Sequence, residues 1–115
     1  MPILRKEDMK SVNPESPELR NVTKSTAISP AEGWEGWVMR IFTLGEEGYS
    51  PKHVHAWPHI NYIIEGEGTL FLEGKENPVK AGDTAYIPGG ELHQLRNTGS
   101  GSFKFICIVP EEGDK

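Results

Sequence analysis

The four histidines of this 115-residue chain lie in two short segments. His53, His55 and His59 fall close together, and His93 follows a Pro-Gly-Gly turn further along the chain. Neutral imidazole nitrogen is a common ligand of divalent transition metals. Because no histidine lies outside these two segments, we predict that all four side chains are directed at a single metal ion.

Strand geometry explains how the first histidines could share a metal. Residues two apart on a strand project from the same face, so His53 and His55 can bring both rings to one point. Trp57 and Pro58 then interrupt the strand, and His59 opens the next one. A lone His-x-His pair also occurs by chance at polar surface positions. The prediction therefore depends on the spacing of the whole set.

That spacing resembles the two sequence signatures of the cupin superfamily. The stretch Gly82-x5-Pro88-x-Gly90-x2-His93-x3-Asn97 matches the second signature in full, and residues 48–66 resemble the first. His59 stands where the family usually has glutamate, which is similar to a four-histidine subset of small bacterial cupins. The resemblance implies four metal ligands: His53, His55, His59 and His93.

The fourth histidine changes the charge of the implied site. Four neutral imidazoles leave the full charge of a divalent ion uncompensated, whereas a carboxylate ligand would cancel part of it, so the site attracts an anionic substrate more strongly. An all-nitrogen ligand set suits one ion of manganese, iron, nickel, cobalt, copper or zinc. Octahedral coordination would leave open positions for a substrate, while tetrahedral zinc would give a closed structural site. No organic cofactor site is predicted.

Turn residues set the fold class. Thirteen glycines and nine prolines punctuate the chain at short intervals, and no segment has helical periodicity. Eight or more short strands therefore predict an all-β fold, and the resemblance implies a cupin double-stranded β-helix, a jelly-roll barrel. We assign residues 31–115 to the barrel and residues 1–30 to a short N-terminal arm that includes an early strand at 22–28.

Alternation along two strands predicts further pocket residues. In the strand over 34–44, Arg40 shares the Phe42 face, where it would orient a substrate carboxylate or pair with a nearby glutamate. Both faces of this strand are mostly apolar, which predicts cover on both sides. In the strand over 103–109, Cys107 falls on the apolar face, as a thiol facing the metal cavity or as a small core side chain.

Three smaller expectations complete the site and its surroundings. Asn61 has the strand parity of His59 and is a candidate to hydrogen-bond a metal-bound water. Trp57 is expected at the rim, because Pro58 places it in a turn. Residues 73–77 are expected to form a turn that precedes a short extended segment at 78–80.

The ligand set and the resemblance lead to one main functional hypothesis and two alternatives. The main hypothesis is a metal-dependent oxidoreductase of the oxygenase or dioxygenase type, acting on a small enolizable or phenolic substrate. The alternatives are a Lewis-acid isomerase or cyclase, and a non-catalytic cupin that binds a small ligand. The fold alone does not decide among them.

Composition limits the partners and the location. A net charge of −5 without a cluster of basic residues argues against nucleic acid. Residues 1–10 are charged and contain no apolar run, so neither a signal peptide nor a membrane span is expected. The single cysteine indicates a reducing compartment, the cytoplasm. A homodimer is expected, with the first thirty residues as a candidate contact.

Overall fold

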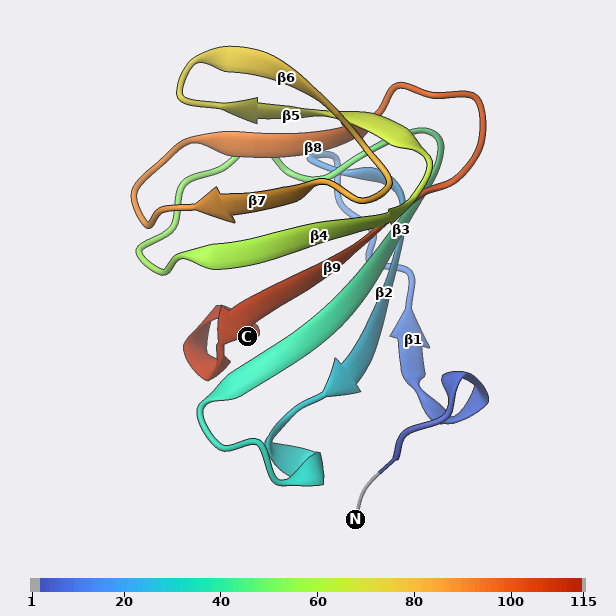
Figure 1. The fold of residues 1–115 in the computed structure, drawn as a ribbon, viewed down its shortest axis with the longest axis vertical. Helices are drawn as coiled ribbons and strands as arrows, with labels where there is room; N and C mark the ends of the chain where they lie inside the picture. Colours follow the sequence, from blue (N-terminus) through green and yellow to red (C-terminus); the bar gives the residue numbers. More distant parts are fainter. Residues whose placement is uncertain (1–2, 115) are drawn as a thin grey trace.

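The computed structural model describes residues 3–114 as one curled antiparallel β-sheet (Figure 1). The strands in this range are β1 (Lys10–Val12), β2 (Arg20–Ile28), β3 (Trp37–Tyr49), β4 (His59–Glu65), β5 (Glu67–Leu72), β6 (Lys75–Lys80), β7 (Thr84–Ile87), β8 (His93–Asn97) and β9 (Phe103–Pro110). The helical elements in this range are short 3-10 turns: η1 (Lys6–Asp8), η2 (Pro30–Glu32) and η3 (Glu111–Asp114). The all-β class predicted from the turn residues is confirmed.

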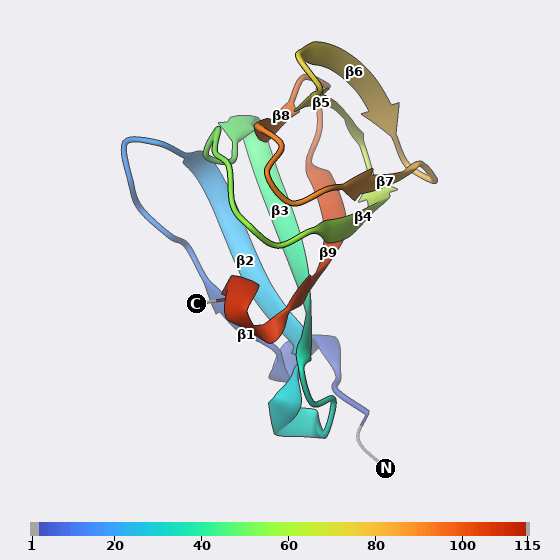
Figure 2. The same ribbon diagram turned by 90° about the vertical axis from the view of Figure 1, so that its left-hand side faces the viewer.

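The strand order closes the sheet into the predicted jelly-roll barrel. The hydrogen-bonded order is β6-β5-β8-β3-β9-β4-β7, with β2 beside β3 and β1 beside β2. Strand β3 pairs with β9 and β2 along most of its length and reaches β8 only at its end. Contacts between β4 and β6 bring the two halves of the curled sheet together (Figures 1 and 2).

The side chains of β9 alternate between the barrel interior and the outer surface, as the sequence pattern predicts. Phe103, Phe105, Cys107 and Val109 are buried, and the side chains between them are more exposed. The main core cluster fills one end of the barrel and consists of Val22, Leu44, Ile63, Leu70, Ile87, Leu95, Phe103 and Phe105. Burial of these side chains is the main source of folding free energy. Cys107 lies further along β9, where the core gives way to a pocket.

Strand β2 joins the early part of the chain to the barrel. The strand expected at 22–28 is β2, which pairs antiparallel with β3 from Arg20 to Ile28 with two register shifts. Strand β1 adds to the free side of β2. The segment therefore shapes the barrel wall next to Arg40, which pairs with Thr26 across the two strands.

The turn expected at 73–77 is wrong in its extent. Only Glu73 and Gly74 connect β5 to β6, and both have positive φ, 54° and 72°. Two consecutive residues in this region make the tight hairpin turn whose twist matches the strands. Pro78 lies inside β6, which is tolerated because β6 is an edge strand and the missing N–H is not needed there.

The outer face of the sheet is less covered than expected. On β3 the face that carries Met39 and Ile41 is only half-buried in this chain, and Trp37 is exposed. The expectation that both faces of this strand are covered is therefore not met by this chain alone. Within residues 3–114 the structure has no helix with the length and apolar character needed to cross a membrane.

Candidate metal centre

A reciprocal backbone bridge joins the two histidine segments. The His53 N–H donates to the His93 carbonyl oxygen and the His93 N–H donates to the His53 carbonyl oxygen, both at 3.1 Å. His59 begins β4, as predicted, and His93 begins β8. His53 and His55 do not lie on a strand: one isolated bridge holds an otherwise irregular segment. That bridge, rather than a regular strand, aligns the first pair.

The four imidazole rings gather at one point. The ring centroid of His55 lies 4.9 Å from that of His53 and 4.8 Å from that of His93. The candidate ligand atoms of His53, His55 and His93 all lie within 4.8 Å of one another. His59 joins from the side, with its Nε2 3.2 Å from Nε2 of His93. The four-histidine ligand set stays a prediction, and the geometry fits it.

Backbone carbonyls fix the ring nitrogens of two histidines. Nδ1 of His55 donates to the Trp57 carbonyl oxygen and Nδ1 of His93 donates to the Glu91 carbonyl oxygen, each at 2.9 Å. A carbonyl only accepts, so Nδ1 carries the proton in both rings and Nε2 keeps its lone pair. Such second contacts orient metal-binding histidines in proteins.

The Pro-Gly-Gly turn holds the His55 segment against the start of β8. The Gly90 N–H donates to the His55 carbonyl oxygen at 2.8 Å. Gly89 passes so close to Ala56 that a Cβ atom there would overlap the Ala56 carbonyl oxygen. Trp57 stacks on the His55 ring, with centroids 4.7 Å apart and planes 8° from parallel. The turn and the indole together restrict where the His55 ring can lie.

Burial lowers the pKa of His53, His59 and His93 and so favours their neutral form. Desolvation, followed by the charges of neighbouring histidines, lowers the pKa of His59 to about 3 and that of His53 to about 4. Although His53 is the most exposed of the four, its ring lies against those of His55 and His93. The pKa of His93 is also lowered, mainly by burial. Neutral imidazole is the form that binds a metal, so this environment prepares the donors.

The donor set fits a cation. Nε2 of His93 carries a lone pair and faces Nε2 of His59 at 3.2 Å. If His59 donates from Nδ1 toward Cys107 Sγ, 3.4 Å away, its Nε2 also presents a lone pair. Two facing lone pairs repel unless a proton or a cation lies between them. A divalent metal at the histidine cluster satisfies both nitrogens and gives His53 and His55 the same partner.

The histidines line a pocket of about 570 Å³. Its other lining residues are Leu19, Lys24, Arg40, Phe42, Ser50, Pro51, Val54, Trp57, Asn61, Leu95, Phe105, Cys107 and Gly113. Asn61 is buried with the parity predicted for it, and its Nδ2 donates to the Ile106 carbonyl oxygen at 3.3 Å. Its Oδ1 is buried without a hydrogen-bond partner among residues 3–114, so it can accept a hydrogen bond from a bound water or ligand.

Arg40 and Cys107 both line this pocket and touch each other. An Arg40 Nη2–H donates to Cys107 Sγ at 3.0 Å. Burial raises the pKa of the Cys107 thiol, so the thiol stays protonated at neutral pH and is a poor nucleophile. Arg40 also lies over the Phe42 ring, 5.0 Å from its centroid. Its carboxylate partner is Asp114, at 3.5 Å, rather than the glutamate considered from the sequence.

Sequence reasoning missed two charged residues of the pocket mouth. Lys24 Nζ lies 2.8 Å from Asp114 Oδ1. Lys24 has the same strand parity as buried Val22, and a lysine on an inward face is a signal that could have been noticed. Nothing in the sequence around Asp114 indicates that the 3-10 turn η3 folds back onto β2 and β3; Figure 2 shows η3 beside these strands.

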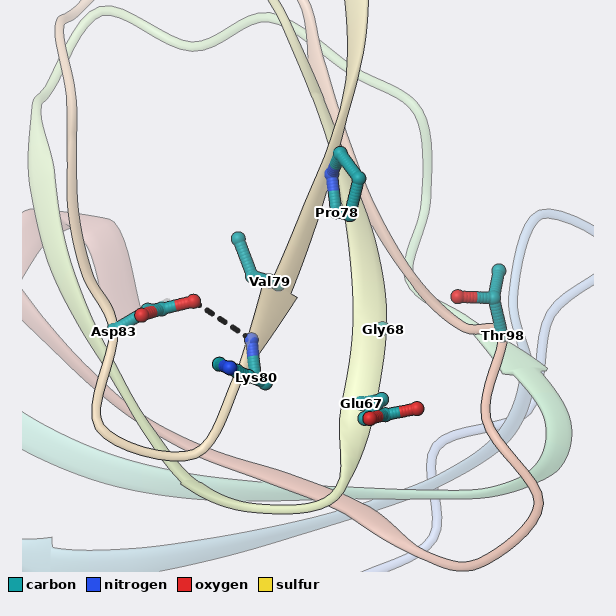
Figure 3. A pocket seen from close by; sticks show the side chains of 7 residues that line it. All are labelled: Glu67, Gly68, Pro78, Val79, Lys80, Asp83 and Thr98. Atoms are coloured by element: carbon teal, nitrogen blue, oxygen red, sulfur yellow. Dashed lines mark hydrogen bonds between the residues drawn. The ribbon is translucent and has the colours of Figure 1, made fainter.

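A second hollow lies away from the histidines. It has a volume of about 400 Å³ and is lined by Glu67, Gly68, Pro78, Val79, Lys80, Asp83 and Thr98 (Figure 3). The Asp83 carboxylate accepts a hydrogen bond from the Lys80 N–H at 2.8 Å and so stabilises the turn between β6 and β7. No imidazole or thiol is among these seven lining residues, so the candidate chemistry lies in the histidine pocket.

The comparisons identify the family. A family model described as the cupin domain matches residues 40–109, the part of the chain that contains both histidine segments. The chain therefore belongs to the cupin domain family, and the resemblance of its two signatures is confirmed.

Individual relatives differ in their reported roles. An oxalate-binding protein of Thermotoga maritima is 40% identical over 44% of this chain and 41% of its own length. A 1-methylthio-D-xylulose 5-phosphate methylsulfurylase of Rhodospirillum rubrum is 31% identical over 87% of this chain and 63% of its own length. The chain thus spans less than two thirds of the length of these relatives. A polyketide cyclase structure from Streptomyces resistomycificus matches 96% of this chain and 79% of its own, with 27% identity and a TM-score of 0.87.

Acid should destabilise the metal-free protein. The unfolded chain protonates His59 near its ordinary pKa of 6.5, whereas the folded chain keeps it neutral down to about pH 3. The unfolded state thus binds more protons below pH 6.5, and the free energy of unfolding falls by at most roughly 1.4 kcal/mol per pH unit for this residue. Urea unfolding in EDTA between pH 7 and pH 4 measures how the free energy of unfolding depends on pH. His59→Gln should flatten the slope, and an equally steep slope in that variant would contradict the assignment.

Gly89→Ala should weaken metal binding. The added Cβ overlaps the Ala56 carbonyl and pushes the His55 segment away from β8, so affinity for Co²⁺ should fall on the order of ten-fold. Gly101→Ala is the matched control, because a Cβ there meets no atom within 4 Å. Competition titration with a chelator and the visible spectrum of bound Co²⁺ report affinity and geometry. Equal affinities in the two variants would show that the turn does not position His55.

Proposed function

We propose that this cupin is a metal-dependent enzyme of the oxygenase type that acts on a small enolizable or phenolic organic acid. The observation that carries the proposal is the convergence of four imidazoles at an apolar pocket that also holds Arg40. A metal-bound substrate needs such a pocket to exclude water, and an anionic one needs a cation beside it.

The proposed roles follow from position. His53, His55, His59 and His93 would hold one divalent transition metal, which when bound supplies a Lewis acid and, if redox-active, activation of the substrate toward dioxygen. Arg40 binds and orients the acidic group of the substrate. Phe42, Leu95 and Phe105 supply the apolar wall against which the carbon skeleton packs. Asn61 Oδ1 accepts a hydrogen bond from a substrate hydroxyl or a water.

The polar lining favours oxygenation over proton shuttling. No glutamate, aspartate or tyrosine is among the residues that line the histidine pocket, and Asp114 at its mouth is paired with two cations. Isomerisation or cyclisation needs a base to move a proton, and the four histidines are assigned to the metal. A metal-bound water would then have to serve as that base.

Two alternatives are supported by similarity to named relatives. The structural likeness to a polyketide cyclase at 27% identity favours a Lewis-acid cyclase or isomerase. The 40% identity over 50 residues to an oxalate-binding protein favours a non-catalytic binding protein for a small carboxylate. Both alternatives share the metal and the anionic ligand with the main proposal, so one experiment separates all three.

Oxygen uptake tests the reaction. Untagged protein should contain about one equivalent of a redox-active transition metal, and with phenolic or enolizable acids it should consume dioxygen. Arg40→Gln should raise KM for the acid on the order of ten-fold or more, since a charged hydrogen bond is lost. The control is Arg20→Gln, because Arg20 pairs with Glu47 at the exposed surface. Turnover by the zinc form without oxygen would favour the Lewis-acid enzyme, and binding without any turnover would favour the binding protein.

We also propose that the chain forms a homodimer through the outer face of β4, β7 and β9. Ile60 and Tyr86 are 51% and 61% exposed, and they are neighbours across the two strands. Ile108 continues the same row on β9. Exposed apolar rows of this kind mark protein contacts.

We propose a cytoplasmic location, because Cys107 is buried and unpaired, as in proteins of reducing compartments.

A charge in the row should separate the subunits. Ile60→Glu places a carboxylate at the proposed interface and should yield a monomer in size-exclusion chromatography with light scattering. Val12→Glu changes an equally exposed residue of β1 and tests the alternative contact through the N-terminal arm. Dissociation by the Val12 change alone would assign the interface to the arm. A monomeric parent protein would contradict both interfaces.

A further inference from the structure

A carboxylate of this chain occupies the mouth of the histidine pocket. Asp114 Oδ1 lies 2.8 Å from Lys24 Nζ and 3.5 Å from Arg40 Nη1. The side chains of Lys24, Arg40 and Asp114 are 23%, 13% and 24% exposed, so this triad is largely removed from water. Lys24 and Arg40 both line the histidine pocket. A ligand in that pocket can therefore reach the two cations that Asp114 contacts.

Register explains why two cations lie together. In the antiparallel pairing of β2 with β3, Lys24 lies opposite Phe42 and Thr26 lies opposite Arg40. Lys24 and Arg40 are thus diagonal neighbours on the inward face, close enough for long side chains to meet. Like charges in a half-buried position repel each other unless an anion lies between them. The sheet therefore builds a site for negative charge, whichever group fills it.

One carboxylate does not saturate this site. Two cations face a single carboxylate, which leaves the triad with a net positive charge. Among residues 3–114, buried Arg40 Nε has no hydrogen-bond partner, and Asp114 Oδ1 lies near both cations without hydrogen-bond geometry. A guanidinium binds a carboxylate best through paired, aligned hydrogen bonds. A ligand carboxylate that makes them would replace Asp114 with better contacts.

The segment that carries Asp114 is lightly held. It is the single 3-10 turn η3, which contains no buried residue. Besides the two ion pairs of Asp114, its attachments include the Glu111 N–H, which donates to the Gly36 carbonyl oxygen at 2.9 Å, and Gly113, which packs against the Trp57 ring. Little apolar surface has to be exposed when such a turn moves, so its displacement costs little free energy.

We propose that Lys24 and Arg40 form a carboxylate-binding subsite beside the metal centre, and that Asp114 occupies it as an internal competitor. This inference rests on the proposed function for its location, and adds Lys24 as a ligand-binding residue and η3 as a displaceable cover. The ligand is a small organic acid whose carboxylate binds the two cations while the rest of the molecule reaches the histidines. A carboxylate is favoured over a phosphate because the group that fills the subsite is itself a carboxylate.

Competition predicts the direction of each substitution. When Asp114 fills the subsite for most of the time, the apparent affinity for a ligand carboxylate is reduced by the fraction of time the subsite is free. Asp114→Asn removes the competing charge and should tighten malonate binding about ten-fold if the subsite is filled roughly nine-tenths of the time. Lys24→Met removes one cation and should weaken malonate binding by a similar factor. In the double variant, the gain from Asp114→Asn should largely disappear.

Calorimetry with malonate on the full, EDTA-treated chain tests the proposal without the metal or turnover. Glu112→Gln is the matched control, because it removes one exposed charge from the same turn and should leave the affinity unchanged. Malonate binding by the parent protein should also speed amide exchange at Gly113 and shift the Trp57 indole resonance, since Gly113 leaves that ring. Both measurements use the parent protein, so neither requires a substituted variant to fold.

Three outcomes would overturn the proposal. They are equal affinities in Asp114→Asn and Glu112→Gln, malonate binding that leaves Gly113 and Trp57 unchanged, and inorganic phosphate binding more tightly than malonate. The proposed oxygenase is tested separately, because it stands or falls on oxygen uptake by metal-loaded protein. If the protein binds malonate as described but consumes no oxygen, the carboxylate subsite is supported and the oxygenase assignment is wrong.

Discussion

The candidate site depends on one short antiparallel bridge between His53 and His93. Its two reciprocal hydrogen bonds join an irregular segment to the first residue of β8, and the nearby contact from Gly90 to the His55 carbonyl extends the attachment. Residues forty positions apart are thereby fixed to within a few ångströms, because a backbone bridge leaves little freedom in the side chains that flank it. His59 needs no such device, since it begins β4 and is positioned by pairing with Ile87 of β7. Ring convergence is thus a property of the backbone, which a metal would complete.

Lys24 and Arg40 give the histidine pocket a positive charge of its own. Burial keeps the pKa of His53 and His59 low, so neutral imidazoles contribute no charge at neutral pH. Lys24 and Arg40 add two cations, of which Asp114 cancels one. A divalent ion at the histidines would therefore lie in an already positive pocket with largely apolar walls, where Coulomb interactions are stronger than in water. Such a pocket would favour an anionic ligand, and this is the physical basis of the substrate class proposed above.

Much of this could be predicted from the sequence, and the failures have a common cause. The period of two along β4 and β9 correctly placed Asn61 beside His59 and put Cys107 on the inner face, because strand parity is local. The two signatures, in which histidines stand at fixed spacing from glycines and a proline, identified the family. The extent of the Glu73–Gly74 turn was missed because residues 75–77 were assigned to the turn, although they form the start of β6. Lys24 and Asp114 were missed because their pairing requires the register of β2 on β3 and the path of η3, neither of which the local sequence determines.

The two sides of the pocket are built differently, and this difference limits which side can vary. The histidine side is built from backbone bridges and tight glycine turns, so few substitutions can vary it without loss of the metal geometry. The opposite wall is built from side chains of β2, β3 and η3, where a change alters charge or shape without disturbing the bridge. A polyketide cyclase shares this fold, and proteins described as oxalate-binding and as a methylsulfurylase are similar to the chain in sequence. If the proposed roles hold, differences in ligand between such proteins should reside in residues equivalent to Lys24, Arg40 and Asp114, because this wall would select the anion while the histidines would hold the metal.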